Sequence, residues 1–444
     1  MVGPICKLSR WSGSKRQGNR YILCVVTLLS LSIAALVIFS AGFSTNKRPK
    51  ALYLVGLIIS NVLVSIFMVC LPLAHKMKAK EDVKLALDAK EHELDADTEF
   101  LKTLTGLPTR FTFKELESAT ANFGLKLGRG GFGSVYEGIL SDGCKVAVKR
   151  LEREGHGQKE FCAEVATISR VRHLNLVFLK GFCVEGAERL LVYEYMSGGS
   201  LDRWIFQDKI SASDSVPAKF IVLSWKTRFD IALDIARGLT YLHEECEEKI
   251  LHLDIKPQNI LLDTKFHAKL SDFGLSRSMD RAQSRVLTTM RGTPGYLAPE
   301  WFNDEGIDIK ADVYGYGMVL LELVSGRRSV DQSQSNPENW YLPTMAFKKV
   351  QNKAALELVD PMLIGTLDAA DCHQIVMSVN IALWCIQDKV SLRPKMSTVV
   401  QMLDGSTSVE DPPCSSMLMS KQRLPLSSVS NITVIDAETI SIPR

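Results

Sequence analysis

Residues 251–259 read LHLDIKPQN and place three polar side chains at fixed spacing behind a histidine. Asp254 can accept the proton of a hydroxyl group, Lys256 can contact a phosphate, and Asn259 can hold a magnesium ion. Phosphoryl transfer needs this combination, because the protein mainly positions the acceptor and neutralises developing charge. The stretch therefore predicts phosphoryl transfer, although Leu253 stands where most sequences of this kind carry Arg.

A glycine-rich loop precedes this stretch at residues 127–138, LGRGGFGSVYEG. Glycines let the backbone approach phosphates closely. The same pattern also opens dinucleotide-binding folds, but there it joins a strand to a helix. Here two β-branched runs follow, so we expect the loop to lie between two strands of a hairpin and to cover nucleotide phosphates. The candidate nucleotide-binding residues of this loop are Leu127, Gly128, Gly130, Gly131, Gly133 and Val135.

The strand predicted at residues 145–149, KVAVK, alternates its side chains between two faces. Ala147 and Lys149 share one face, and Val146 and Val148 share the other. Ala147 would line an adenine pocket, and Lys149 would reach the α- and β-phosphates. The alternative is a surface lysine on a half-buried strand.

A helix is predicted next, because Phe161, Val165 and Ile168 follow helical spacing. Glu164 lies beside this apolar stripe, where a glutamate is ordinarily a solvated flank. The preceding loop and lysine favour an ion pair between Glu164 and Lys149 instead.

A second acidic motif follows at residues 270–276, LSDFGLS. Magnesium prefers hard carboxylate and amide oxygens as ligands. Asp272 is therefore predicted to be the main metal ligand, together with Asn259.

The order of these motifs resembles the protein-kinase signature, which ends here in APE at residues 298–300. The resemblance covers residues 123–404. It implies an α+β, two-lobed protein-kinase fold, with a small β-rich lobe, a larger helical lobe, and ATP and Mg²⁺ bound between them. Three phrases are similar to plant receptor-like kinases of the Pelle-related branch: FTFKELESATANF, LVYEYMSGGSLD and RGTPGYLAPEW. Within that branch the chain resembles small members with two hydrophobic segments and no ectodomain.

The resemblance implies further roles around the adenine. Tyr193 would be the gatekeeper, Glu194 and Met196 would bound the adenine-binding hinge, and Leu261 would form the floor under adenine.

The resemblance also implies supporting contacts near the catalytic loop. Asp312 would brace that loop, and Arg393 would pair with Glu300. Lys256 and Thr293 would both contact Asp254, as in the serine/threonine class.

The two ends of the chain differ in charge. Residues 1–80 carry eleven Lys or Arg and no Asp or Glu, so the remaining 364 residues are acidic by eight charges. Nucleic acid is therefore not expected as a partner. The ten cysteines form no CxxC pair, which favours reduced thiols over a disulfide framework or a zinc site.

Two segments, 21–43 and 51–74, contain no charge and are long enough to cross a bilayer as helices. With the basic tail 1–20 and the short loop 44–50, they predict a hairpin anchor with both ends in the cytosol. A signal peptide cleaved near Gly42 and an organelle transit peptide are the alternatives. The membrane is expected to be the plasma membrane, with the kinase domain cytosolic.

The flanking segments carry less information. Residues 75–122 are assigned to a juxtamembrane segment, with either a solvated helix ending near residues 106–108 or a plain spacer. Residues 207–222 form an inserted loop without an assigned role. Residues 405–444 contain no aromatic side chain and predict a disordered tail.

These patterns favour a membrane-anchored serine/threonine protein kinase that acts on protein substrates. Its expected partner is a receptor or co-receptor in the membrane, because residues 44–50 are too few to recognise a ligand; the oligomeric state stays open. A pseudokinase scaffold and a membrane adaptor are the alternative hypotheses.

Leu253 predicts different control of a working loop. An Arg at this position pairs with an activation-segment phosphate, and Leu cannot do so, yet phosphoryl transfer itself needs no Arg there. Possible phosphorylation sites on residues 272–300 are Ser284, Thr288 and Thr289.

We expect loop phosphates to tune the activity without being a strict on-switch. Replacing Ser284, Thr288 and Thr289 together with Ala should lower phosphate incorporation less than about tenfold, or roughly 1.4 kcal/mol of barrier. Thr293 is left unchanged because of its expected contact with Asp254. Complete loss of activity in a triple variant that melts like the wild type would contradict this expectation.

Overall fold

The computed structural model describes 77–79 and 108–413, without residues 131–132, 152–156, 170, 207–221, 289, 304–305 and 332–338. Both predicted membrane spans, most of the juxtamembrane segment, the tail from 414 onward and nearly all of the inserted loop lie outside these residues. No helix among the described residues has the length and apolarity needed to cross a bilayer. The chain divides into units Met1–Glu93 and Leu94–Arg444. The two lobes below belong to the second unit.

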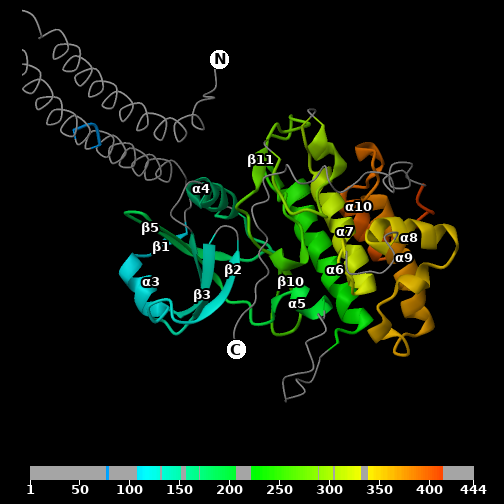
Figure 1. Cartoon of the computed structure of the whole chain (residues 1–444), viewed down its shortest axis with the longest axis horizontal. Coiled ribbons are helices and arrows are strands. Elements are labelled where there is room, and N and C mark those ends of the chain that lie inside the picture. The colour runs from blue at the N-terminus through cyan, green and yellow to red at the C-terminus, as the bar shows by residue number, and fades with distance from the viewer. Residues whose placement is uncertain are drawn as a thin grey trace, which may run out of the picture. The chain divides into compact units, whose positions relative to one another are not determined.

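The smaller lobe is built on a six-stranded sheet with the order β1-β5-β6-β4-β3-β2 (Figure 1). Its strands are β1 (Thr109–Arg110), β2 (Lys126–Gly130), β3 (Gly133–Ile139), β4 (Lys145–Leu151), β5 (Leu179–Glu185) and β6 (Glu188–Glu194). β2 and β3 form an antiparallel pair that ends at the register Gly130 to Gly133. The glycine-rich loop therefore connects two strands of a hairpin, as predicted.

The alternation predicted for β4 is confirmed. Val146 and Val148 are fully buried in a small cluster on one side of the sheet. Lys149 and Ala147 lie on the other side, where Ala147 packs against the main core. Because Lys149 is only 9% exposed, the alternative of a surface lysine is wrong.

A helix, α4 (Gly157–Ile168), covers the Lys149 side of this sheet. The three predicted core residues, Phe161, Val165 and Ile168, are buried. Because Glu164 lies on the same helix between them, the packing of this stripe brings its carboxylate to β4.

Some residues before 122 also pack onto the small lobe. The sequence analysis had assigned these residues to a juxtamembrane segment. β1 pairs in parallel with β5, and α3 (Phe113–Ala119) follows it. The Thr112 hydroxyl accepts the Glu115 N–H, and the Glu115 carboxylate accepts the Thr112 N–H, which forms a capping box. Leu116 is fully buried against Val146 and Val148.

The larger lobe is helical. Its helices are α5 (Asp202–Ile205), α6 (Trp225–Thr240), α7 (Lys310–Ser325), α8 (Leu342–Gln351), α9 (Ala369–Cys385) and α10 (Met396–Leu403). α7 is buried over nearly its whole length and packs against α6 and α9, so it forms the centre of the lobe (Figure 1). The predicted two-lobed α+β fold is confirmed.

Short strands hold the catalytic loop at the edge of this lobe. The turn Tyr241–Glu245 ends α6 and leads into β8 (Lys249–Leu251), which pairs with β11 (Arg277–Met279). Residues 252–256 and the 3₁₀ turn Pro257–Asn259 come next. β9 (Ile260–Leu262) then pairs with β10 (Ala268–Leu270) and β7 (Gly199–Ser200). Asn259 and Asp272 thus flank a pair of adjacent strands.

Replacing Leu116 with Ala should destabilise the small lobe, because it opens a cavity under Val146 and Val148. We expect a loss of about 2–5 kcal/mol, measured as a lower thermal midpoint of the purified chain. Leu125 is the matched control, since it is 58% exposed and Leu125→Ala should leave the midpoint nearly unchanged. Equal midpoints for the two variants would show that α3 is not part of the folded lobe.

Candidate active site

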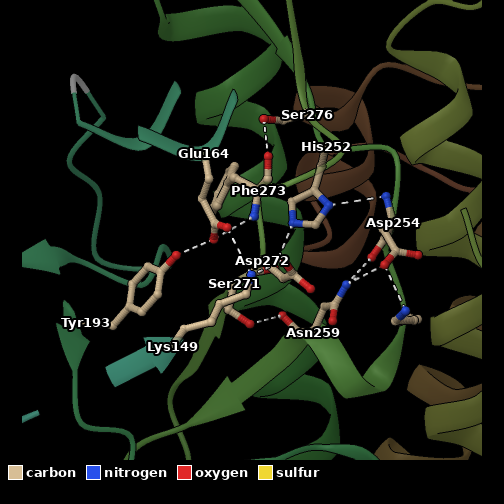
Figure 2. Close-up of polar contacts among 11 residues, drawn as sticks. Lys149, Glu164, Tyr193, His252, Asp254, Asn259, Ser271, Asp272, Phe273 and Ser276 are labelled. Atoms are coloured by element: carbon tan, nitrogen blue, oxygen red, sulfur yellow. Dashed lines mark hydrogen bonds and ion pairs between the residues drawn. The ribbon is translucent and has the colours of Figure 1, made fainter. Parts of the chain in front are cut away.

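A buried lysine joins the two lobes (Figure 2). Lys149 Nζ lies 2.9 Å from Glu164 Oε2 and 2.7 Å from Asp272 Oδ1. β4, α4 and the segment after β10 each supply one of these groups. The ion pair with Glu164 is confirmed, and the contact with Asp272 was not predicted. This lysine therefore ties the small lobe to the candidate metal ligand of the large lobe.

The charges around Lys149 control its protonation. Burial would lower the pKa of Lys149, but the carboxylates of Asp272 and Glu164 outweigh it and hold the pKa above its usual value. Burial likewise opposes ionisation of Asp272, whereas the Lys149 charge lowers the pKa of that carboxyl below its usual value. The site is therefore charged at neutral pH, with a fixed cation facing any bound phosphate.

Tyr193 donates its hydroxyl to Glu164 Oε1, as Figure 2 shows. The backbone N–H of Phe273 donates to the same oxygen over 3.3 Å. Burial and the Glu164 charge raise the pKa of Tyr193, so the phenol keeps its proton and donates. The sequence placed Tyr193 beside adenine, and nothing in the spacing of residues indicated this contact with Glu164.

The Asp254 carboxylate is held by three side chains. Thr293 Oγ1 donates to Oδ1 over 2.7 Å, Lys256 Nζ lies 2.8 Å from Oδ2, and Asn259 Nδ2 donates to Oδ2 over 2.9 Å. Lys256 also donates to Thr293 Oγ1 over 2.7 Å. The predicted contacts of Lys256 and Thr293 with Asp254 are confirmed. The carboxylate is thereby fixed at a single orientation beside a cation.

Asp312 holds the backbone of the catalytic loop. Its carboxylate accepts the N–H of His252 over 2.8 Å and that of Leu253 over 2.7 Å, as predicted. His243 Nε2 lies 2.9 Å from the same carboxylate. Burial opposes ionisation of Asp312, but the hydrogen bonds and charges of His243 and His252 together outweigh it and lower the pKa of the carboxyl. Leu253 has φ of 67°, a left-handed conformation that a non-glycine residue adopts only when its surroundings hold it.

His252 connects the loop to the segment after β10. Its Nδ1 accepts the Asp254 N–H at 3.3 Å, so Nε2 carries the hydrogen and donates to the Ser271 carbonyl at 3.0 Å. The His252 and Phe273 rings pack with centroids 4.9 Å apart. Asp272 follows with φ of 67°, which directs its carboxylate to Lys149.

The residues predicted to hold magnesium fit such an ion. Both N–H bonds of the Asn259 amide go to the carbonyl and carboxylate of Asp254, which leaves the amide oxygen as an available ligand. Ser271 N–H and Oγ both donate to the Asn259 carbonyl at 2.9 Å, which keeps Asp272 close. No group of three or more His, Cys, Asp or Glu in the described ranges could enclose a metal. One carboxylate and one amide suit magnesium that takes its other ligands from phosphates and water.

The glycine-rich loop fits a phosphate ligand. A Cβ added to Gly128 or Gly130 would meet no atom within 4 Å, so the described protein does not itself require glycine there. A Cβ on Gly133, with φ of 149°, would lie 2.2 Å from the Arg150 carbonyl oxygen. Glycine at 133 is thus needed for the hairpin, whereas the other two leave room for a ligand. Gly131 lies outside the described residues.

The residues predicted around adenine are distributed over both lobes. Val135 on β3 is in register with Lys149, and Ala147 on β4 is in register with Tyr193 on β6. Leu127 on β2, Met196 after β6 and Leu261 on β9 are at least half-buried. The Glu194 carboxylate is bound by Lys269 and by the Phe178 N–H, so only its backbone can serve as a hinge contact.

The predicted pair of Glu300 and Arg393 is confirmed. Arg393 Nη1 and Nη2 donate to the two carboxylate oxygens at 2.7 and 2.8 Å. Arg393 also donates to the carbonyls of Gln387 and Lys310. This buried, bidentate pair fixes the end of the segment 272–300 to the large lobe.

Comparison with known proteins agrees with this geometry. Residues 122–402 match the protein kinase domain. The chain belongs to the protein kinase family. This kinase is 51% identical over 347 residues to the G-type lectin S-receptor-like serine/threonine-protein kinase SD2-5 of Arabidopsis thaliana, covering 78% of this chain and 40% of that protein. It is 40% identical over 402 residues to a probable receptor-like protein kinase of the same plant, covering 89% and 88%.

These relatives place the kinase among the plant receptor-like serine/threonine-protein kinases. A third relative is the G-type lectin S-receptor-like serine/threonine-protein kinase LECRK3 of Oryza sativa subsp. indica, 40% identical over 387 residues, with 85% of this chain and 44% of that protein covered. The chain spans only 33–40% of the length of three lectin-type relatives.

The activation segment of this kinase, residues 272–300, contacts the large lobe at several points. The Tyr296 hydroxyl donates to the Glu322 carboxylate on α7 at 2.8 and 3.0 Å, and the Ser329 N–H donates to it at 2.6 Å. Val286 forms a bridge with Ile307. Burial raises the pKa of Glu322 to about 8. Of the possible phosphorylation sites, Ser284 is exposed, Thr288 is half-buried, and Thr289 lies outside the described residues.

Glu322 should make the stability of this kinase depend on pH. Its folded pKa of about 8 lies above the ordinary value of 4.5, so the folded chain keeps a proton that the unfolded chain releases. The free energy of unfolding should therefore fall as pH rises between about 4.5 and 8, by on the order of a few kcal/mol.

The measurement compares thermal midpoints of the wild type and Glu322→Gln between pH 5 and 8. Gln keeps one acceptor oxygen, at the Oε1 position that Tyr296 and Ser329 both contact, but it cannot ionise. We expect the midpoint of the variant to rise relative to the wild type as pH increases. A difference that stays constant over this range would contradict the prediction.

Proposed function

We propose that the chain transfers the γ-phosphate of ATP to serine or threonine hydroxyls of protein substrates. The observation that carries this proposal is the Asp254 carboxylate, fixed by Thr293, Lys256 and Asn259. Such an acceptor beside a lysine can orient a hydroxyl group and receive its proton. The contact of Thr293 with Asp254 supports the serine/threonine class, as do the printed names of the relatives.

The other residues of the site would bind and orient the nucleotide. When bound, ATP with Mg²⁺ supplies the phosphoryl group and a metal ion that neutralises its charge. Lys149 would contact the α- and β-phosphates, and Asn259 and Asp272 would hold the metal. Asp254 orients the substrate hydroxyl and takes up its proton, while Lys256 stabilises charge on the transferred group. The glycine-rich loop would cover the phosphates.

We also propose that this kinase is anchored in the plasma membrane by two spans. Segments 21–43 and 51–74 carry no charge, and basic residues flank both, which favours cytosolic ends and a cytosolic kinase domain. The relatives named receptor-like support a membrane setting. A receptor or co-receptor in the membrane would then supply the input. The short loop 44–50 also favours an additional role as a membrane adaptor.

Replacing Lys149 with Met should reduce phosphate incorporation from Mg-ATP to background, because the cation at the phosphates is lost. Lys145 is the matched control: it lies on the same strand, its side chain is 49% exposed, and it pairs with Glu137. Lys145→Met should keep nearly full activity. Asp254→Asn tests the proposed role of the Asp254 carboxylate as proton acceptor, separately from the role of Lys149. An inactive wild type with normal melting would favour the scaffold hypothesis.

The proposed topology predicts that a tag at residue 1 is protected from protease in sealed, right-side-out vesicles, because both chain ends face the lumen of such vesicles. The tag should become sensitive when detergent opens the vesicles. A mature chain that starts near Phe43 would instead show a cleaved signal peptide.

A further inference from the structure

Residues 405–413, which we call the strap, continue past α10 and contact α9 without regular secondary structure. Gly405 follows the end of α10 with φ of 81°, a left-handed conformation that glycine adopts readily and that turns the chain. Val409 packs against the main core. The strap is therefore part of the folded large lobe, although the match to the protein kinase domain ends at residue 402.

Two side chains at the end of α9 and just after it bind the backbone of the strap. The Trp384 indole N–H donates to the Glu410 carbonyl at 2.9 Å. The Gln387 amide donates to the Pro413 carbonyl at 3.2 Å. Gln387 is only 3% exposed, so its amide has little access to water and depends on these protein acceptors.

The backbone of Gln387 faces a different part of the lobe. α9 ends at Cys385 and is capped by Ile386, so helical hydrogen bonds do not set the direction of the Gln387 carbonyl. That carbonyl accepts Arg393 Nε at 2.8 Å. The side-chain amide of Gln387 also donates to the Leu383 carbonyl at 2.9 Å. Its two side-chain bonds thus fix the residue whose carbonyl holds Arg393.

Arg393 carries the connection to the activation segment. Its two terminal nitrogens donate to the Glu300 carboxylate, and Glu300 is the last residue of that segment. Continuous hydrogen bonds therefore run from the Pro413 carbonyl through Gln387 and Arg393 to Glu300. All three side chains along this path are at least nine-tenths buried.

We infer that Gln387 is a positioning residue for phosphoryl transfer to protein substrates, because it couples the strap to Arg393 and thereby to Glu300. The inference rests on the proposed function for the reaction itself. Thr293, which donates to Asp254, belongs to the same segment as Glu300. Loss of the Gln387 bonds therefore loosens the side of the site that receives the protein substrate. The contacts of Lys149 with the nucleotide side stay unchanged.

The first test needs no turnover. In the full chain, Gln387→Met keeps a side chain of similar size and removes both amide donors. Amide hydrogen exchange is measured for residues 298–303, where the Trp301 and Asn303 N–H groups are hydrogen-bonded. We expect about tenfold faster exchange there, the effect of roughly one lost hydrogen bond. Exchange within α6 should stay unchanged.

Two further variants show whether the path is responsible. Gln401→Met is the matched control, because Gln401 is an exposed glutamine on α10, and it should leave exchange at residues 298–303 unchanged. Trp384→Phe removes the indole donor to the strap without altering Gln387, and it should raise exchange at the same residues. The effects of Trp384→Phe and Gln387→Met should be less than additive, because both act through the strap.

The second test separates positioning from a general loss of structure. With dephosphorylated casein as acceptor, Gln387→Met should lower kcat/KM for casein about fivefold. The KM for ATP and the rate of ATP hydrolysis without casein should stay at the wild-type values. A variant that is merely less folded would lose casein phosphorylation and ATP hydrolysis in the same proportion.

The inference is overturned if Gln387→Met leaves exchange at residues 298–303 unchanged, or if α6 exchanges faster by the same factor. It is also overturned if ATP hydrolysis falls together with casein phosphorylation, or if the effects of Trp384→Phe and Gln387→Met on exchange are additive. A wild-type chain that transfers no phosphate would overturn the proposed function instead, and the exchange measurements would still decide the coupling.

Discussion

The carboxylate of Asp312 is the constraint on which the catalytic loop depends. It lies on the buried helix α7 and accepts the N–H groups of His252 and Leu253. These bonds hold Leu253 in a left-handed conformation. The backbone therefore turns at Leu253, and the side chains of His252 and Asp254 point to different partners. His252 then packs on Phe273, while Asp254 meets Lys256 and Thr293. Because α7 is the centre of the large lobe, the loop that carries the Asp254 carboxylate is attached directly to the core.

The activation segment is likewise held by groups of the large lobe. Each of its anchors uses a group that belongs to the lobe: the carbonyls after α6 for Arg281, the Glu322 carboxylate for Tyr296, and Arg393 for Glu300. A kinase that lacks a cation at position 253 therefore still has an ordered segment against Asp254.

The family resemblance implied the two-lobed architecture, and sequence patterns predicted several of the residues that meet at the site. The alternation of KVAVK and the helical spacing around Glu164 predicted their ion pair only together with the preceding glycine-rich loop, because a glutamate beside an apolar stripe is ordinarily solvated. The family resemblance supplied the contacts of Asp312 and Arg393. Spacing could not predict that Lys149 is shared with Asp272, or that Tyr193 donates to Glu164, since both depend on how the lobes meet. It also missed the packing of Leu116, because a seven-residue helix has too few apolar positions to show a period.

The packing of α3 has a practical consequence for recombinant work. Leu116 and the flanking Phe111 and Phe113 cover a cluster formed by Val146, Val148, Cys183, Leu190 and Val192. A fragment that begins at residue 122, where the family match starts, would leave this apolar surface open to water. Such a surface promotes aggregation even when the catalytic residues are intact. Soluble fragments for crystallisation or inhibitor screening should therefore begin no later than residue 108.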